Sequence, residues 1–421
     1  MVKSPVVDID GKHLSLSNLD KVLYPEVGFT KGQVIDYYAR IAPVLLPHLK
    51  DRPLTMKRYP GGVEQEYFFE KNAPKHRPDW IKTVPVWSYG NNRNVNYILA
   101  NNLPTLIWIA NLASLELHPS LSLGKDVSTP TMMVFDLDPG PPANMVQCTQ
   151  VAFWLREIFE HFGLESFPKT SGSKGLQIYV PLNTSTSYQQ TKPFANALAR
   201  LLEQQHPELV VSDMKKAIRV GKVLVDWSQN DEHKTTISIY SLRARPHPTI
   251  STPVTWEEVE HVLAKKNPEL VVFEADDVLK RVDKLGDLFA PVLTLKQKLP
   301  DVHALAAAQG GEEEHLEIAA QAEERAQQMS KASARRVRLA PVTSPPSDRS
   351  PRPRTASAER RSSGRKAAAL TEQKTDSRDN TGKSRAAKTT SSNRKPGVGK
   401  SSKPKGKSAG QSKPATKKRK V

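Results

Sequence analysis

Three acidic residues each stand at the end of an apolar stretch that has the composition of a β-strand. Asp136 and Asp138 lie in "MVFDLDPG", and Asp226 lies in "VLVDWSQN". Side chains two residues apart on a strand point to the same face, so the carboxylates of Asp136 and Asp138 would lie close together and repel each other. Burial of a carboxylate in an apolar strand is costly by itself. A divalent cation removes both penalties, and Mg²⁺ and Mn²⁺ are commonly shared between carboxylates and substrate phosphates. The pattern predicts a metal site for a phosphorylated substrate, although for Asp138 alone a turn at Pro139-Gly140 is an equal explanation.

A second group of residues suits phosphate binding. The turn in "KTSGSKGLQIYV", residues 169–180, contains Ser171 and Lys174 beside two glycines and precedes a predicted strand. Glycines let backbone N–H groups approach phosphate oxygens, and a lysine adds a compact positive charge. The turn does not match a P-loop, whose lysine follows a longer loop and precedes a helix. A plain hairpin turn is the alternative explanation.

The stretch "DWSQNDEHKTTISIYSLRAR" adds a glutamine and two arginines to the same candidate site. Gln229 follows Asp226 closely, and Arg243 and Arg245 end the next predicted strand on one face. If that strand pairs with the strand of Asp226, the arginines approach the acids, and guanidinium groups suit bidentate contacts with phosphate. The alternative is a pair of surface charges at a strand end.

Basic and aromatic residues in the N-terminal part fit the end of a nucleic acid, where charge meets phosphate and a ring stacks on a base. They are Lys21, Lys31 and Lys57, with Phe68 and Phe69 in "YFFEK". Because neighbouring side chains on a strand point to opposite faces, we expect only one of the two phenylalanines to face outward and the other to lie in the core.

Strands and helices must position these residues, and the sequence mixes both without an internal repeat, which predicts an α/β or α+β fold. Helical spacing follows the N-cap residue Thr30, and "LPTLIWIANLASLELH" predicts a buried helix that runs toward His118. A further helix is expected after the strand at 132–138, with Val151, Leu155, Ile158 and Phe162 on one stripe, and another is expected at residues 189–205. Strands are expected at 54–59, 132–138, 176–182, 222–228 and 235–245.

The charge of the chain is concentrated in its last ninety or so residues. Residues 331–421 contain 27 Lys and Arg against 5 Asp and Glu, so they carry +22 while the whole chain carries +18 and residues 1–330 carry −4. This segment has no aromatic residue and predicts a disordered tail that binds DNA without sequence preference and in a salt-sensitive way. Its ending, "KKRKV", resembles a nuclear import signal, but a DNA tether is the favoured interpretation.

Cysteine content and hydropathy limit the protein class. Cys148 is the single cysteine, so neither a disulfide within the chain nor a cysteine-based zinc site is possible. The N-terminus lacks the apolar run of a signal peptide, and no stretch approaches the ~20 apolar residues of a membrane span. We expect a soluble protein of a reducing compartment with no membrane partner.

Together these motifs resemble the polymerase domain of bacterial ligase D, a member of the archaeo-eukaryotic primase superfamily that acts in non-homologous end joining. The resemblance spans residues 12–295 and keeps the family's order: "DKVLYP", "FFEK", "LELH", "VFDLDPG", "TSGSKGL", "VDWSQN" and "YSLRAR". It implies an α+β, primase-like catalytic core of mixed or antiparallel sheets flanked by helices. The expected domains are a polymerase domain over 1–298, a helical linker over 299–330 and the disordered DNA-binding tail over 331–421.

The resemblance also implies roles for residues. Asp136, Asp138 and Asp226 would be catalytic and hold two Mn²⁺ or Mg²⁺ ions. The incoming nucleotide and its triphosphate would be held by His118, Ser171, Lys174, Gln177, Gln229 and Arg243. The downstream 5′-phosphate and the template would be held by Lys21, Lys31, Lys57, Phe68 and Phe69.

The function implied by the resemblance is metal-dependent nucleotidyl transfer at DNA ends. Such an enzyme extends 3′ ends and fills short gaps with NTPs or dNTPs, with a preference for NTPs. Expected partners are 5′-phosphorylated DNA ends, a Ku-type end-binding protein and a separate DNA ligase, since no ligase or nuclease module is recognisable here. The expected location is the bacterial cytoplasm, at the nucleoid.

One residue departs from the family pattern, and two other functions are compatible with parts of the sequence. Gln177 stands where the family has a histidine, so its amide can donate to a phosphate but never carries an imidazolium charge. A haloacid-dehalogenase-type phosphatase also ends a strand in Asp-x-Asp, but it expects Thr or Val where this chain has Pro139-Gly140. The other alternative is a non-catalytic DNA-end-binding or architectural protein that acts through its basic tail.

Overall fold

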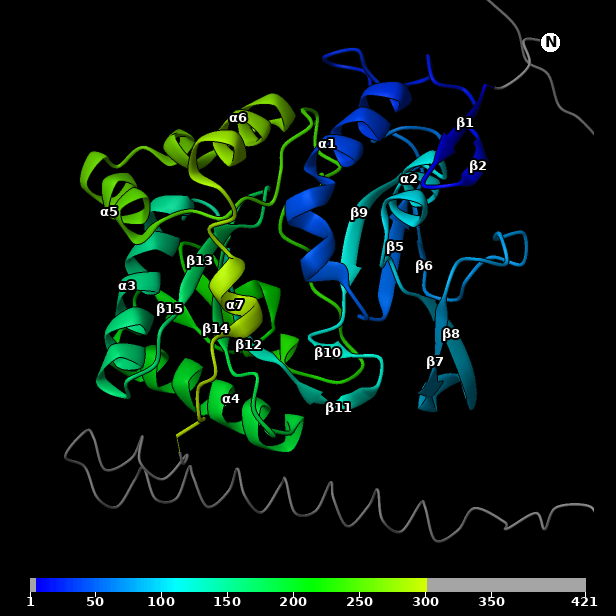
Figure 1. The fold of residues 1–421 in the computed structure, drawn as a ribbon. Coiled ribbons are helices and arrows are strands. Elements are labelled where there is room, and N and C mark those ends of the chain that lie inside the picture. Colours follow the sequence, from blue (N-terminus) through cyan, green and yellow to red (C-terminus); the bar gives the residue numbers. More distant parts are fainter. Residues whose placement is uncertain (1–4, 301–421) are drawn as a thin grey trace, which may run out of the picture. The chain divides into compact units, whose positions relative to one another are not determined.

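The structure, a computed structural model, describes residues 5–300 (Figure 1). The predicted disordered tail over 331–421 lies outside the described residues, and so does the predicted helical linker except for its first two residues. Within the described part, helices and antiparallel sheets alternate along the chain, which confirms the α+β class. None of the helices in this part is both long and apolar enough to span a membrane.

The first sheet is antiparallel and contains β5 to β9. Strand β5 pairs with β6, β8 and β9, and β7 pairs with β8. Two short hairpins, β1–β2 and β3–β4, precede it. The bounds are β1 (Val6–Ile9), β2 (Lys12–Ser15), β3 (Val22–Tyr24), β4 (Phe29–Thr30), β5 (Leu54–Arg58), β6 (Phe68–Glu70), β7 (Thr83–Ser88), β8 (Arg93–Ile98) and β9 (Ser114–Pro119).

Helix α1 (Lys31–Leu49) begins where the sequence predicts. The hydroxyl of Thr30 accepts a hydrogen bond from the Gln33 backbone N–H, and the Gln33 side chain accepts one from the Thr30 N–H. This capping box satisfies N–H groups that the first turn would leave unpaired. The apolar residues at helical spacing are all buried: Val34, Tyr37, Tyr38, Ile41 and Leu45. They pack in one core with α2 (Leu103–Asn111).

The second sheet has the strand order β13-β14-β12-β16-β15 and is antiparallel except between β15 and β16. Its bounds are β12 (Met132–Pro139), β13 (Phe167–Thr170), β14 (Leu176–Pro181), β15 (Val210–Val211) and β16 (Val223–Asp226). Met133, Phe135 and Leu137 face a core formed with α3 (Met145–His161) and α4 (Tyr188–Gln205). Met132 and Val134 belong to the core of the first sheet, so β12 is covered on both faces.

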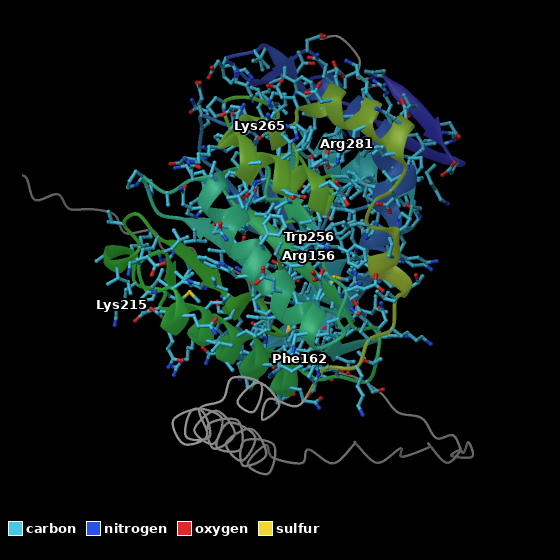
Figure 2. The ribbon with its side chains drawn as sticks, turned by 90° about the vertical axis from the view of Figure 1, so that its left-hand side faces the viewer. Arg156, Phe162, Lys215, Trp256, Lys265 and Arg281 are labelled. Carbon is cyan, nitrogen blue, oxygen red and sulfur yellow. The ribbon has the colours of Figure 1, made fainter. Side chains whose placement is uncertain are left out.

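The remaining elements complete the two cores. Strands β10 (Ser122–Leu123) and β11 (Asp126–Pro130) form a hairpin. Helices α5 (Trp256–Lys265) and α6 (Ala275–Leu285) follow β16, and Figure 2 shows Trp256 of α5 beside Arg156 of α3 and Arg281 on α6. The others are α7 (Ala290–Thr294) and the 3-10 turns η1 (Tyr89–Asn91), η2 (Lys216–Ile218), η3 (Trp227–Gln229) and η4 (Pro268–Val271).

Two predicted elements are wrong. The stretch 103–118 is not one helix, because α2 ends at Asn111 and residues 114–119 form β9 instead, which pairs with β5. The stretch 235–245 forms no strand. Its backbone N–H groups at Thr236 and Ser238 donate to carbonyls of β9 rather than to β16. In both places pairing with a distant strand outweighs the local apolar pattern.

Candidate active site

The three acidic residues meet at one end of the second sheet. Asp136 on β12 lies directly opposite Asp226 on one neighbouring strand and Gln177 on the other. Residues opposite each other in a sheet share a face, and Asp138, two residues along β12, shares it too. The strand order therefore brings together three carboxylates that are up to ninety residues apart in the sequence.

Nearby positive charge compensates the carboxylates of Asp136 and Asp138 only in part. Burial, and then the neighbouring Asp138, raise the pKa of Asp136 to about 7, although Gln177 and Lys169 oppose the shift. Asp138 sits at the more exposed end of the strand, yet partial desolvation and the charge of Asp226 raise its pKa as well. The Oδ1 atom of Asp136 is buried and has no hydrogen-bond partner. Such an unpaired acceptor beside a second carboxylate fits a hard cation.

Asp226 is held more firmly than the other two acids. Its Oδ1 accepts hydrogen bonds from the Ser228 N–H at 2.9 Å and the Ser228 hydroxyl at 2.6 Å, and its Oδ2 accepts one from Gln229 Nε2 at 3.0 Å. Gln229 thus orients one of the three acidic residues Asp136, Asp138 and Asp226, which we call the acidic row. Within residues 5–300, no group of three or more His, Cys, Asp or Glu side chains is arranged so that it could hold a metal ion by itself.

Lys169 lies beside the acidic row, and the sequence motifs did not single it out. It lies opposite Gln177 in the sheet, so Lys169, Gln177, Asp136 and Asp226 form one line across four strands. Lys169 is fully buried, and its Nζ donates to the Ser251 hydroxyl at 2.6 Å. Burial lowers its pKa well below the usual value, while the charge of Asp136 opposes that shift. A lysine inside the apolar strand "FPKT" was the available sequence signal.

Gln177 is buried between these charges. Gln177 stands in the line across the sheet between Lys169 and Asp136. Its Nε2 lies 3.3 Å from the Thr236 hydroxyl, and its Oε1 is buried without a hydrogen-bond partner. A neutral amide at this position contributes a donor near the carboxylates and adds no charge to the row.

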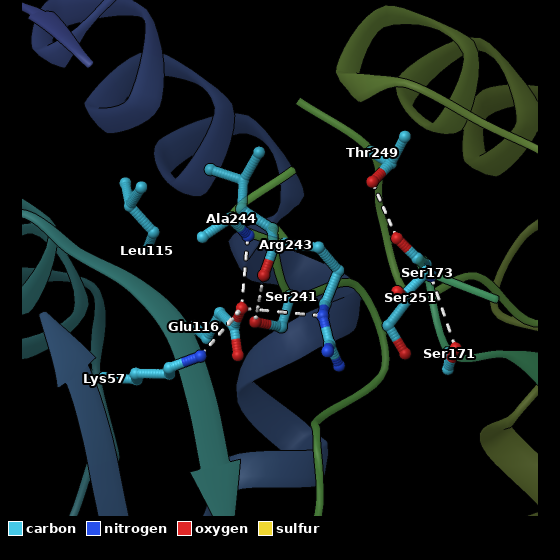
Figure 3. Close-up of polar contacts among 12 residues, drawn as sticks. Lys57, Leu115, Glu116, Ser171, Ser173, Ser241, Arg243, Ala244, Thr249 and Ser251 are labelled. Atoms are coloured by element: carbon cyan, nitrogen blue, oxygen red, sulfur yellow. Dashed lines mark hydrogen bonds and ion pairs between the residues drawn. The ribbon is translucent and has the colours of Figure 1, made fainter. Parts of the chain in front are cut away.

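The Ser/Gly/Lys turn packs directly on other backbone. A Cβ atom at Gly172 would lie 2.6 Å from the Ile250 carbonyl carbon, and one at Gly175 would lie 2.3 Å from the Leu137 carbonyl oxygen of β12. Thr249 donates from its hydroxyl to the Gly172 carbonyl at 2.6 Å (Figure 3). Ser171 is buried and its Oγ accepts from the Gly175 N–H at 3.2 Å, whereas Lys174 is exposed. The glycines therefore fix the turn beside the acidic row.

Glu116 on β9 is the other functional candidate that the motifs did not single out, although it lies inside "LELH". Its carboxylate is 3.0 Å from His118 Nε2. It is also 3.6 Å from Arg243 Nε and 3.7 Å from Lys57 Nζ (Figure 3). Burial would raise the pKa of Glu116, but the hydrogen bond from His118 and the charges of Arg243, His118 and Lys57 lower it to about 2. Burial lowers the pKa of His118 in turn. The structure thus gathers three predicted site residues around an unpredicted acid.

Replacing Glu116 with Gln should remove part of the acid sensitivity of the fold. The pKa of this carboxyl is about 2 in the folded protein against 4.5 for an ordinary glutamate. A pKa that is lower in the folded state stabilises the protein above pH 4.5, and this stabilisation is lost as the pH falls toward 2. The free energy of unfolding, measured by urea titration, should therefore drop by about 2 kcal/mol more in the wild type than in Glu116→Gln between pH 7 and pH 3. Equal drops would contradict the low pKa.

Lys57 and the two phenylalanines form an aromatic surface next to this acid. The Nζ atom of Lys57 is 4.1 Å from the ring centre of Tyr67 and 5.5 Å from that of Phe69, and Phe69 makes an edge contact with His118 at 6.0 Å. The expectation that one phenylalanine lies in the core is wrong, because Phe68 is 44% exposed and Phe69 56%. Strand β6 is an edge strand that pairs only with β5 among the described strands, and neither of its phenylalanines is covered by a core.

Lys21 and Lys31 belong to a separate cationic group with Arg58. Lys31 is 5% exposed, and its Nζ donates to the Ser17 carbonyl at 2.6 Å. Burial, followed by the charges of Lys21 and Arg58, lowers the pKa of Lys31 to about 8. Arg58 pairs with Glu70 at 2.8 Å, whereas neither Lys21 nor Lys31 makes an ion pair with an acidic side chain among residues 5–300. The unbalanced positive charge is suited to an anion.

Comparison with known proteins agrees with these features. The family model described as LigD, primase-polymerase domain, matches residues 30–289. The Multifunctional non-homologous end joining protein LigD of Mycolicibacterium smegmatis is 43% identical over 283 residues, which cover 67% of this chain and 36% of that protein. The Bifunctional non-homologous end joining protein LigD of Bacillus subtilis is 32% identical over 274 residues, 65% of this chain and 43% of that protein.

A solved structure is similar as well. The polymerase domain from Mycobacterium tuberculosis ligase D in complex with DNA superposes with a TM-score of 0.62 at 40% identity, covering 68% of this chain and 99% of the other. The chain spans between about a third and two fifths of the length of the relatives described here. The matched region contains the acidic row, the Ser/Gly/Lys turn and Glu116. This chain therefore belongs to the LigD primase-polymerase domain family.

Proposed function

We propose that this protein is a DNA-dependent nucleotidyltransferase that extends 3′ ends and fills short gaps at DNA double-strand breaks in non-homologous end joining. The observation that carries the proposal is the acidic row of Asp136, Asp138 and Asp226, with a buried unpaired oxygen, facing the basic side chain of Arg243. The relatives are named as end-joining proteins, and the similar solved structure is a polymerase domain in complex with DNA.

In this proposal the three acids hold two divalent ions, Mn²⁺ or Mg²⁺. Such ions, when bound, favour ionisation of the primer 3′-hydroxyl and balance the charge that develops on the phosphates. Gln229 fixes the Asp226 carboxylate, and Lys169 balances part of the negative charge from within the sheet. Arg219, in the segment that follows β15, supplies a second positive charge near the acids, and this charge lowers the pKa of Asp138.

The incoming nucleotide is assigned to the space beside this row. Ser171 and Lys174 of the turn, together with Arg243 and Gln177, would contact the triphosphate, and His118 would contact the rest of the nucleotide. Because Gln177 carries no charge, binding of the triphosphate should lack the pH dependence that a histidine at this position would add. We infer a preference for NTPs from the family alone.

The direct test is extension of a primer on a gapped duplex whose downstream strand carries a 5′-phosphate. With Mn²⁺ and a mixture of NTPs or dNTPs, the purified protein should lengthen the primer by a few nucleotides and release pyrophosphate. Release of inorganic phosphate from a small phosphoester without primer extension would instead favour a phosphatase. DNA binding without any incorporation would favour an architectural role.

The cationic group of Lys21, Lys31 and Arg58 is assigned to the downstream 5′-phosphate, and Lys31→Gln tests it. We expect the affinity for 5′-phosphorylated gapped DNA to fall about 10-fold, because one charge-assisted hydrogen bond is lost. Affinity for the same DNA without the phosphate should stay the same, as measured by fluorescence anisotropy. Lys280→Gln, a change of an exposed lysine on α6, is the control and should affect neither DNA. An equal loss on both DNAs would remove the assignment.

The basic segment 331–421 is assigned a DNA-tethering role that supports the catalytic domain in a bacterial cytoplasm. Its 27 Lys and Arg residues would release counterions from DNA, so deletion of the segment should flatten the dependence of DNA affinity on salt concentration. Binding titrations between 50 and 200 mM salt measure this slope. An unchanged slope would leave nuclear import, or another role, as the function of "KKRKV". A Ku-type protein and a separate ligase are the proposed partners.

A further inference from the structure

Glu116 stands at the centre of a cationic cluster, which is an unusual place for a carboxylate. Its Oε1 accepts a hydrogen bond from the Ala244 N–H at 3.1 Å and lies near Arg243 and Lys57, and its Oε2 contacts His118. The side chain is only 3% exposed. Two sections of the chain meet at this one group: the sheet strands β5 and β9, and the irregular segment that contains Arg243 and Ala244.

A negative charge here opposes the binding of a polyphosphate, so attraction of the substrate is not the role of Glu116. The negative charge of Glu116 instead offsets the repulsion between the cations Arg243 and Lys57. Arg243 lowers the pKa of Lys57, which means that the two positive groups repel, while Glu116 raises it. Without Glu116 the flexible lysine would move toward solvent and the guanidinium of Arg243 would lose its nearest anion.

The path of Arg243 shows why its anchoring matters. A Cβ atom at Gly172 would lie 2.7 Å from Arg243 Cγ, so the arginine stem passes directly over the Ser/Gly/Lys turn. The backbone is held at the next residue by the bond from Ala244 to Glu116. The guanidinium charge also reaches Asp138, whose pKa it lowers. Arg243 therefore bridges the space between Glu116 and the acidic row, and Figure 3 shows it next to Glu116 on one side and the turn on the other.

We propose that Glu116 is a positioning residue of the nucleotide site, whose carboxylate holds Arg243 and His118 where they meet the incoming nucleotide. The inference rests on the proposed function and adds to it a residue that does not touch the substrate. It predicts that loss of the carboxylate weakens nucleotide binding without weakening DNA binding. A purely structural ion pair would change stability alone.

The chain offers a matched control for that structural alternative. Glu258 on α5 pairs with Arg281 on α6 through both carboxylate oxygens, one of them 2.6 Å from the guanidinium Nη1. Figure 2 shows Arg281 on the face formed by α3, α5 and α6. Glu258 is 33% exposed, so it is less buried than Glu116, but it also has arginine as its ion-pair partner and has none of the candidate site residues around it. Glu258→Gln therefore reports what the loss of an internal ion pair does by itself.

The experiment compares Glu116→Gln and Glu258→Gln in the full chain on gapped DNA. For Glu116→Gln we expect the KM for the nucleotide to rise at least about 10-fold, the scale of one lost charge-assisted contact, with a smaller change in kcat and the same Kd for DNA. For Glu258→Gln we expect a lower melting temperature and an unchanged KM. An unchanged nucleotide KM in Glu116→Gln, or a rise of the same size in both variants, would overturn the inference.

Three further variants keep the test decisive. If Glu116→Gln fails to fold, the double variant Glu116→Gln/Lys57→Met removes the unpaired ammonium; it should fold and still show the raised KM, whereas a normal KM would overturn the inference. In an Arg243→Gln background, adding Glu116→Gln should raise the KM much less than it does in the wild type, because the two residues act together. Full additivity would contradict that coupling.

The same measurements separate this inference from the proposed function. A wild-type protein that incorporates no nucleotide would overturn the proposed function and this inference with it. A wild type that extends primers, beside a Glu116→Gln variant with a normal nucleotide KM, would overturn only the role of Glu116.

Discussion

Primer extension on gapped DNA should fall at least about 1,000-fold when Asp138 is replaced by Ala, a loss that corresponds to about 4 kcal/mol of transition-state stabilisation. The reason is that Asp138 supplies one of the oxygen ligands of the proposed metal site. The fold should not suffer. Desolvation and Asp226 raise the pKa of Asp138, so its ionised form is unfavourable in the folded protein, and removing it leaves the free energy of unfolding at pH 7 the same or higher.

Three measurements check this prediction: the single-turnover extension rate with Mn²⁺, the Kd for gapped DNA, and the melting temperature without divalent ions. We expect the first to collapse, the second to stay the same and the third to stay or rise. Asp283→Ala, at an exposed position of α6, serves as the control and should extend primers like the wild type. Wild-type extension rates in pure Asp138→Ala protein would remove the metal mechanism altogether.

Gly172→Ala should affect both stability and activity. Gly172 has a φ of +67°, where an alanine costs about 1–2 kcal/mol, and the new methyl group would meet the backbone of Ile250 and Ser251 at 2.6 Å. Since backbone cannot move aside as a flexible side chain does, overpacking adds about 1–3 kcal/mol more. The turn and the Arg243 stem above it would shift, so we expect the extension rate to fall at least about 100-fold, the effect of misplacing a contact group by about 1 Å.

Gly163→Ala is the matched control for this substitution. Gly163 has the same φ of +67°, but nothing lies within 4 Å of the position of its Cβ. The backbone penalty is therefore common to both variants, and the difference between their free energies of unfolding isolates the contact with residues 250–251. Gly163→Ala should keep full activity. If both variants lose stability and activity equally, the contact between the turn and residues 250–251 is not needed for primer extension.

Some of this site could be predicted from the sequence because its signal is local. Asp136, Asp138 and Asp226 interrupt apolar strands, and the strand pattern alone fixes which face they share. The N-cap at Thr30 and the helix that follows it were predictable for the same reason. Where prediction depended on distant pairing it failed: residues 114–119 form a strand only because β5 lies beside them.

The residues that were missed depend on contacts across long separations. Glu116 matters through Ala244, 128 residues later, and Lys169 through Ser251, 82 residues later. No window of sequence around either residue contains its partner. The expectation for Phe68 and Phe69 failed for a different reason, because alternation tells which side chains share a face but not whether either face is covered.

The hydroxyl groups of α1 have a consequence for how the chain reaches its native state. Tyr37 donates to the Tyr240 carbonyl at 2.8 Å, and Leu242 donates from its N–H to the Tyr38 hydroxyl at 3.2 Å, links that span just over two hundred residues. During synthesis the first sheet and its helix thus emerge long before the residues that pair with these two tyrosines. High contact order of this kind slows folding, because α1 cannot complete these hydrogen bonds until residues 240–242 have been made. A chain cut before residue 240 would expose the tyrosine layer of α1 to water.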